Sequence, residues 1–193
     1  MKAIARNCTF LFLGLSLSFL SACGTTAVME SHPSLARLGD SNAAKVYFLR
    51  PDIGYHGVMG NAFSISLNDK ELLTLANGEY ALVYLQPVSG VVTVESSTVK
   101  NEGGKNVMTK VKESRPFSFD AGKTYYLAFQ DPNQQQVTSL RDLIVSAMTA
   151  AASPTWGGTS FAPILITGTE AIEAANRTKP VGKALQEPIR QSK

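Results

Sequence analysis

Short apolar segments separated by turn residues run from about residue 44 to residue 130, and this pattern constrains the fold more than any other feature of the chain. Phe63, Ile65 and Leu67 alternate with serines, which places their side chains on one face of a strand. Val46–Leu49 is apolar throughout, as is typical of a strand covered on both faces. Short strands at this regular spacing predict a mainly all-β fold, an antiparallel β-sandwich with one or two peripheral helices.

Residues that favour tight turns separate these segments. Asn68-Asp69 and Asn77-Gly78 tolerate the positive φ angles of hairpin turns, and Asp120–Lys123 predicts a further turn. Glu102–Lys105 predicts the tip of a hairpin and not a phosphate-binding loop. Such a loop requires an earlier glycine and a Ser or Thr after the lysine, and both are missing here.

The sequence changes character after residue 130. Five apolar residues within 137–151 repeat at helical spacing and predict an amphipathic helix. We expect it to pack on the sandwich, with binding to a partner or to the bilayer surface as alternatives. Ile164–Ile166 predicts one more strand. Thr167 and Glu170 fit a capping box that opens a short helix ending at Arg177.

A charged and then apolar leader opens the chain. Lys2 and Arg6 precede Phe10–Leu20, an apolar run about half as long as the ~20 residues that a transmembrane helix needs. We assign residues 1–22 to a signal peptide. Leu20-Ser21-Ala22-Cys23 resembles the lipobox of bacterial lipoproteins, which implies that Cys23 is acylated through a thioether and becomes the first residue. An ordinary signal peptide with a chance cysteine at the cut is the alternative.

Lipidation at Cys23 would determine where in the cell the protein is located. One acyl chain binds a bilayer only marginally, so a multiply acylated cysteine is needed for a stable anchor. We therefore expect a bacterial cell-envelope protein attached to a membrane through its N-terminal lipid. Gly24, not aspartate, follows the cysteine. By resemblance to bacterial sorting patterns this implies the outer membrane, facing the periplasm, with the inner membrane and the cell surface as alternatives.

The rest of the chain divides into three parts. Residues 23–43 are small and polar with scattered apolar positions, and they predict a lipidated N-terminus with a flexible tether, for which partial order through Leu35 and Leu38 is the alternative. Residues 44–178 form the sandwich domain, with a helical or loop insertion at about 131–162. Residues 179–193 contain two prolines and scattered charges, and they predict a flexible C-terminal tail.

Charge and cysteine content argue against several classes of site. The chain has 18 basic and 15 acidic residues, and removal of Lys2 and Arg6 with the leader leaves 16 against 15. This balance argues against a nucleic-acid partner. Cys8 leaves with the leader, so Cys23 has no partner for an internal disulfide, and no Cys/His set has zinc spacing. We expect no metal and no cofactor.

Three strand-and-turn segments follow one another in an informative order: Ala44–Pro51 (AKVYFLRP), Leu75–Tyr80 (LANGEY) and Ala121–Leu127 (AGKTYYL). Together they resemble a bacterial lipoprotein family, domain of unknown function 2846, over about residues 44–129. The resemblance implies a compact β-sandwich and brings no catalytic residues with it. Two features depart from the family: Pro87–Gly90 is longer than its Pro-Gly turn, and residues 134–162 look like an insertion.

No catalytic motif accompanies the reactive side chains. His56 lies in a glycine loop without a positioned nucleophile, and His32 lies in the predicted tether. Four aspartates lie within two residues of Gly, Pro or Asn, where turn hydrogen bonds are the expected role rather than calcium binding or acid–base chemistry: Asp52, Asp69, Asp120 and Asp131. We therefore assign no catalytic residue and no metal ligand.

Two aromatic residues are candidates for an exposed contact, Tyr55 in the glycine loop and Trp156 in a loop-like stretch. The remaining tyrosines lie in strand patterns, where packing is the expected role for most of them: Tyr47, Tyr80, Tyr84, Tyr125 and Tyr126.

These observations predict a non-enzymatic lipoprotein that binds another envelope component, a protein or a polysaccharide. One alternative is an envelope hydrolase on the same sandwich, which would need His56 or a turn carboxylate at its centre. The other is a structural lipoprotein whose residues 134–162 assemble with copies of themselves. The partner and the oligomeric state stay open.

Overall fold

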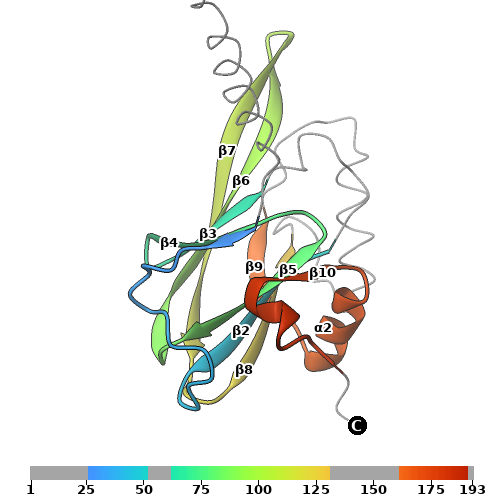
Figure 1. Cartoon of the computed structure of the whole chain (residues 1–193). Helices are drawn as coiled ribbons and strands as arrows, with labels where there is room; N and C mark the ends of the chain where they lie inside the picture. The colour runs from blue at the N-terminus through green and yellow to red at the C-terminus, as the bar shows by residue number, and fades with distance from the viewer. Residues whose placement is uncertain (1–25, 52–61, 131–160, 191–193) are drawn as a thin grey trace, which may run out of the picture.

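The computed structural model of the chain describes residues 26–51, 62–130 and 161–190, and in these residues two five-stranded sheets pack face to face (Figure 1). The first sheet has the order β1 (Ala27–Val28), β4 (Lys70–Leu75), β3 (Phe63–Leu67), β6 (Val88–Glu102) and β7 (Lys105–Phe119). The second has the order β10 (Lys179–Val181), β5 (Glu79–Leu85), β2 (Ala44–Arg50), β8 (Thr124–Gln130) and β9 (Ala162–Leu165). The predicted mainly β, sandwich-like fold is confirmed.

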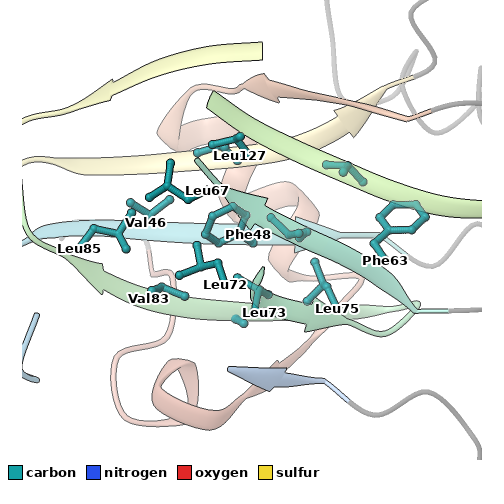
Figure 2. Packing of buried hydrophobic residues seen from close by; sticks show 14 of the residues in the cluster. Val46, Phe48, Phe63, Leu67, Leu72, Leu73, Leu75, Val83, Leu85 and Leu127 are labelled. Atoms are coloured by element: carbon teal, nitrogen blue, oxygen red, sulfur yellow. The ribbon is translucent and has the colours of Figure 1, made fainter. Parts of the chain in front are cut away.

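The main core lies between the two sheets (Figure 2). Val46 and Phe48 enter it from β2, and Ile65 and Leu67 enter it from β3; all four are fully buried. Alternate residues of a strand point to opposite faces, so the period-two pattern of β3 is the pattern of this core. Each such buried side chain contributes about 1.5–3 kcal/mol, which makes this cluster the main contact between the sheets.

A second apolar layer covers the outer face of the second sheet. Tyr47, Tyr80 and Tyr84 are buried there under the helix α2 (Gly168–Ala175) and the 3-10 helix η2 (Gly182–Leu185). Small alanines of the two helices allow this close approach: Ala171, Ala174 and Ala184. The layer explains why β2 and β5 are apolar on both faces, and it confirms that these tyrosines pack rather than lie exposed.

The predicted turns and the predicted helix cap are present. Asn68-Asp69 has φ angles of 52° and 62°, and Gly78 has a φ angle of 72°. Thr167 and Glu170 form the capping box in both directions, and the helix that follows ends at Ala175. Local turn chemistry was therefore sufficient to place these chain reversals.

Two strand pairs are parallel, so the second sheet is mixed rather than purely antiparallel. β2 pairs with β8 in parallel, and β10 pairs with β5 in parallel. In the first sheet, the register between β3 and β4 shifts beside Leu72, which lies opposite no single residue of β3. This bulge allows the consecutive residues Leu72 and Leu73 both to be buried.

β6 and β7 form a hairpin that extends beyond the rest of the first sheet (Figure 1). The two strands pair along their whole length, whereas β3 pairs with β6 only over 92–95. The tip is the predicted turn, where Gly103 and Gly104 have φ angles of 59° and 82°. Near it, Met108 is 62% exposed.

The prediction of a flexible tether over 23–43 is wrong for its described part, because residues 26–43 pack on the domain. β1 pairs with β4, and Leu35 forms a bridge with Leu85. Val28 and Leu35 pack against the main core. A few large apolar residues, Leu35 among them, thus dock a segment whose overall composition indicates a linker.

The prediction of a flexible tail over 179–193 is also wrong for its described part. β10 adds to the edge of the second sheet beside β5, and η2 follows directly. Val181 packs against the main core, and Ile189 packs against the second apolar layer. The edge of β5 offers unpaired backbone groups, and β10 satisfies them.

Candidate functional site

A groove opens on the side of the sandwich where β1 and β10 form the edges of the two sheets. Its volume is about 490 Å³, and ligand pockets typically measure about 300–1,000 Å³. All but one of its lining residues belong to the segments 26–37 and 181–183; the exception is Ala81 of β5. The two segments that were predicted to be flexible therefore build the walls of this groove.

The lining combines apolar and charged residues. Val28, Leu35 and Val181 are half-buried and continue the main core into the groove. The charged residues of the lining are Glu30, Arg37 and Lys183. Among the described residues, no carboxylate lies within ion-pair distance of Arg37 or Lys183. The groove thus offers an apolar strip and two cations that are available to a ligand.

Hydrogen bonds hold β1 and the preceding Thr26 against β4, β5 and the turn between them on the N-terminal side of the groove. The Thr26 hydroxyl donates to the Glu79 carboxylate and accepts from the Ala76 backbone N–H at 2.9 Å. The Ala27 N–H donates to Thr74 Oγ1 at 3.1 Å. Only two residues of β1 pair with β4, and so short a pairing would be only marginally stable by itself. The side-chain hydrogen bonds therefore help to hold β1 in place.

His32 fixes the segment that crosses from the first sheet to the second. The Ser34 N–H donates to His32 Nδ1 at 3.1 Å, so Nδ1 is the acceptor and Nε2 carries the proton. Nε2 then donates to the Leu67 carbonyl at 3.3 Å. Further along, the Ala36 N–H donates to the Tyr84 carbonyl at 2.9 Å. His32 is 6% exposed, and its position indicates a structural role.

Glu187 fixes the C-terminal side of the groove. Its carboxylate accepts hydrogen bonds from the Tyr84 hydroxyl and from Lys45 Nζ, the latter at 2.7 Å. Its backbone carbonyl accepts from the Tyr47 hydroxyl at 2.8 Å. Lys183 lies one helical turn earlier, with Nζ 5.9 Å from the centre of the Tyr84 ring. Three groups of the second sheet therefore hold the segment that carries Lys183.

The surroundings of Glu187, Tyr47 and Tyr84 favour an ionised carboxylate and protonated hydroxyls. Hydrogen bonds from Lys45 and then Tyr84 lower the pKa of the Glu187 carboxyl below its usual 4.5. Burial, followed by the Glu187 charge, raises the pKa of Tyr47 from 10.0 to about 12. The same causes, with the Glu187 hydrogen bond, raise the pKa of Tyr84. Near neutral pH the carboxylate is ionised and both hydroxyls keep their protons.

The structure tests only part of the sequence-predicted sites. Six singled-out residues lie outside the described residues, and their assignments stay predictions: Cys23, Asp52, Tyr55, His56, Asp131 and Trp156. The lipobox and the predicted helix over 137–151 also lie outside them. Asp69 occupies its turn, and the Asp120 carboxylate pairs with Lys123 Nζ at 2.6 Å, as expected of turn carboxylates.

The sequence did not indicate the residues of the groove. Arg37 lies between Ala36 and Leu38, and Lys183 lies between Gly182 and Ala184; neither cation belongs to a motif that would distinguish it from an ordinary surface residue. Glu187 follows Gln186 in a segment without periodicity. A usable signal was the presence of Val28, Leu35 and Val181 in segments that are otherwise mostly small and polar, because large apolar residues in such segments indicate docking on a core.

The described part of the chain contains neither a cluster of metal ligands nor a membrane-spanning helix. In residues 26–51, 62–130 and 161–190, no three His, Cys, Asp or Glu side chains come together as a metal site. No helix in the same ranges has the length and hydropathy to cross a bilayer.

Comparison of the chain with protein-family models, with curated proteins and with solved structures gave no match. The resemblance to domain of unknown function 2846 therefore stays a prediction that rests on the three segments named above.

Proposed function

We propose that the protein is a lipid-anchored lipoprotein of a bacterial cell envelope, and that its sandwich binds another envelope component in the groove between β1 and β10. The observation that carries this proposal is the groove itself. It has the volume of a ligand site, and it presents Arg37 and Lys183 beside apolar residues.

The position of the groove along the chain supports the link to a membrane. Thr26 lines the groove, and only Gly24 and Thr25 separate it from Cys23. Three residue steps span at most about 11 Å, so an acylated Cys23 would hold the groove close to the bilayer surface. Residues 26–43 pack on the sheets and do not act as a long spacer. The proposed partner is therefore one that lies near a membrane.

Metabolic labelling tests the anchor. Cells that express the protein are grown with an alkyne analogue of palmitate, and we expect the label on the wild-type protein but not on Cys23→Ala. Label that persists on Cys23→Ala, or none on the wild type, would overturn the anchor.

Site-specific crosslinking tests the binding site. A photoreactive amino acid is placed at Glu30, an exposed residue of the groove lining, and, as a matched control, at the exposed Glu173 on α2. We expect a discrete crosslinked species in envelope fractions from position 30 and not from position 173. The same background pattern from both positions would contradict a binding role for the groove.

A further inference from the structure

One wall of the groove carries the free edge of β1. Val28 lies opposite Leu73, and the flanking Met29 N–H donates to the Leu72 carbonyl at 2.9 Å. Residues of an antiparallel strand alternate between bonding to the neighbour and facing away from it. The N–H and C=O groups of Val28 therefore point away from β4, towards the open side of the first sheet.

The opposite wall cannot receive a strand in the same way. In β10, the Lys179 N–H donates to the Gly78 carbonyl at 2.9 Å, so Lys179 faces β5. The next residue faces outward, and it is Pro180, which has no N–H group. Proline at a sheet edge blocks strand addition. Backbone pairing in the groove is thus directed to β1.

The charges of the groove select what can pair there. Arg37 and Lys183 contribute two positive charges and Glu30 contributes one negative charge, so the lining has a net charge of about +1. Lys183 is half-buried beside the Tyr84 ring, which keeps its ammonium group at the groove. No aromatic residue belongs to the described lining, so the groove offers no ring on which a sugar could stack.

We infer that the groove binds an extended peptide segment that carries a carboxylate, and that this segment adds a strand to β1. The inference rests on the proposed function and names its partner class, a protein rather than a polysaccharide. In this recognition mode, backbone hydrogen bonds provide affinity and side-chain contacts provide selectivity. In this groove the Val28 backbone provides the hydrogen bonds. The apolar strip, together with Arg37 and Lys183, provides the side-chain contacts.

The direct test measures binding of the pentapeptide Val-Glu-Val-Glu-Val amide, labelled with fluorescein at its N-terminal amine, to the full-length protein in detergent by fluorescence anisotropy. Two matched peptides separate the contributions: one with lysines in place of the glutamates, and one with methylated backbone nitrogens. We expect each change to weaken binding by about tenfold or more, because it removes charge complementarity or strand pairing. An unlabelled galacturonate trimer should not displace the acidic peptide.

Variants of the protein place the peptide in the groove. Arg37→Glu and Lys183→Glu should each weaken binding of the acidic peptide by about tenfold or more. Arg177→Glu, an exposed charge reversal outside the groove, should leave it unchanged. Far-ultraviolet circular dichroism checks that each variant is folded. Equal binding by the methylated peptide, displacement by the galacturonate trimer, or folded Arg37 and Lys183 variants with normal affinity would overturn the inference.

The proposed function and the inferred peptide site can be overturned independently of each other. A crosslinked partner from position 30 together with no binding of the acidic peptide would overturn peptide addition to β1 and leave the envelope binding role standing. Saturable peptide binding to a protein that takes no lipid label would overturn the anchor and leave the peptide site standing.

Discussion

Lys45 and Glu187 are 142 positions apart in the chain, and Lys45 Nζ lies 2.7 Å from Glu187 Oε2. The same carboxylate accepts the Tyr84 hydroxyl, and the Glu187 backbone carbonyl accepts the Tyr47 hydroxyl. One residue thus fastens the C-terminal segment to β2 and β5. Lys183, which lines the groove, lies on that segment, so the contact also positions one wall of the groove.

Replacement of Glu187 by alanine should lower the free energy of unfolding by about 1–2 kcal/mol. The main cost is that Tyr84, which is fully buried, loses the acceptor of its hydroxyl. The ion pair with Lys45 is more than a third exposed and contributes little. Urea unfolding followed by circular dichroism measures the change. Glu173→Ala, at an exposed position of α2, is the control and should stay within about 0.5 kcal/mol of wild type; equal midpoints for the two variants would contradict the prediction.

Alkaline pH should destabilise the protein through the same contact. Burial raises the pKa of Tyr47 from 10.0 to about 12 in the folded state, and the pKa of Tyr84 is raised as well. The unfolded chain releases these protons above pH 10, whereas the folded chain retains them. Their contribution is therefore complete below pH 10 and is lost as the pH rises from 10 towards 12. Urea unfolding at pH 8, 9, 10 and 11 tests this, and the double variant Tyr47→Phe, Tyr84→Phe should show a shallower decline.

The sandwich was predictable because burial of one face leaves a period of two in the sequence. Phe63, Ile65 and Leu67 show that period, and the structure buries all three. Asn77-Gly78 marks the turn between β4 and β5 because a residue at positive φ is required there. Each of these signals lies within a few consecutive residues, so it can be recognised in the sequence without knowledge of the tertiary structure.

The groove was not predictable, because its walls form only where the finished sheets end. Val28 lies in a run of only three apolar residues, Ala27–Met29, and Val181 lies between Pro180 and Gly182; neither belongs to a periodic pattern that would indicate a strand. Their docking depends on the edges of β4 and β5, which exist only after distant strands have paired. The bulge at Leu72 is similar, since two consecutive leucines look like a break in the alternation until the register is known.

Replacement of His32 by alanine should loosen the segment that the sequence alone predicted to be a flexible tether. The variant loses the acceptor for the Ser34 N–H and the donor to the Leu67 carbonyl, both on a buried ring. We expect a loss of about 1–3 kcal/mol in the free energy of unfolding. Amide hydrogen exchange over residues 30–38 should increase in the variant. Leu38→Ala, at a residue 46% exposed, is the control; unchanged exchange in His32→Ala would mean that His32 does not hold the segment.

Gly90 and Asn68 should be energetically coupled across the first sheet. A Cβ atom at position 90 would collide with the Asn68 side chain, whose Oδ1 accepts the Val91 N–H at 2.9 Å. Gly90→Ala should therefore force that side chain away and cost about 1–3 kcal/mol of unfolding free energy. Asn68→Gly removes the obstacle, and glycine suits the φ angle of 52° at that position.

The double variant should consequently be more stable than the sum of the two single losses predicts, by about 1 kcal/mol or more. A urea-unfolding cycle of the wild type, both single variants and the double variant measures this coupling. Strict additivity would show that the methyl group at position 90 is accommodated without moving Asn68. The tight approach of β6 to the turn between β3 and β4 would then play no part in setting their register.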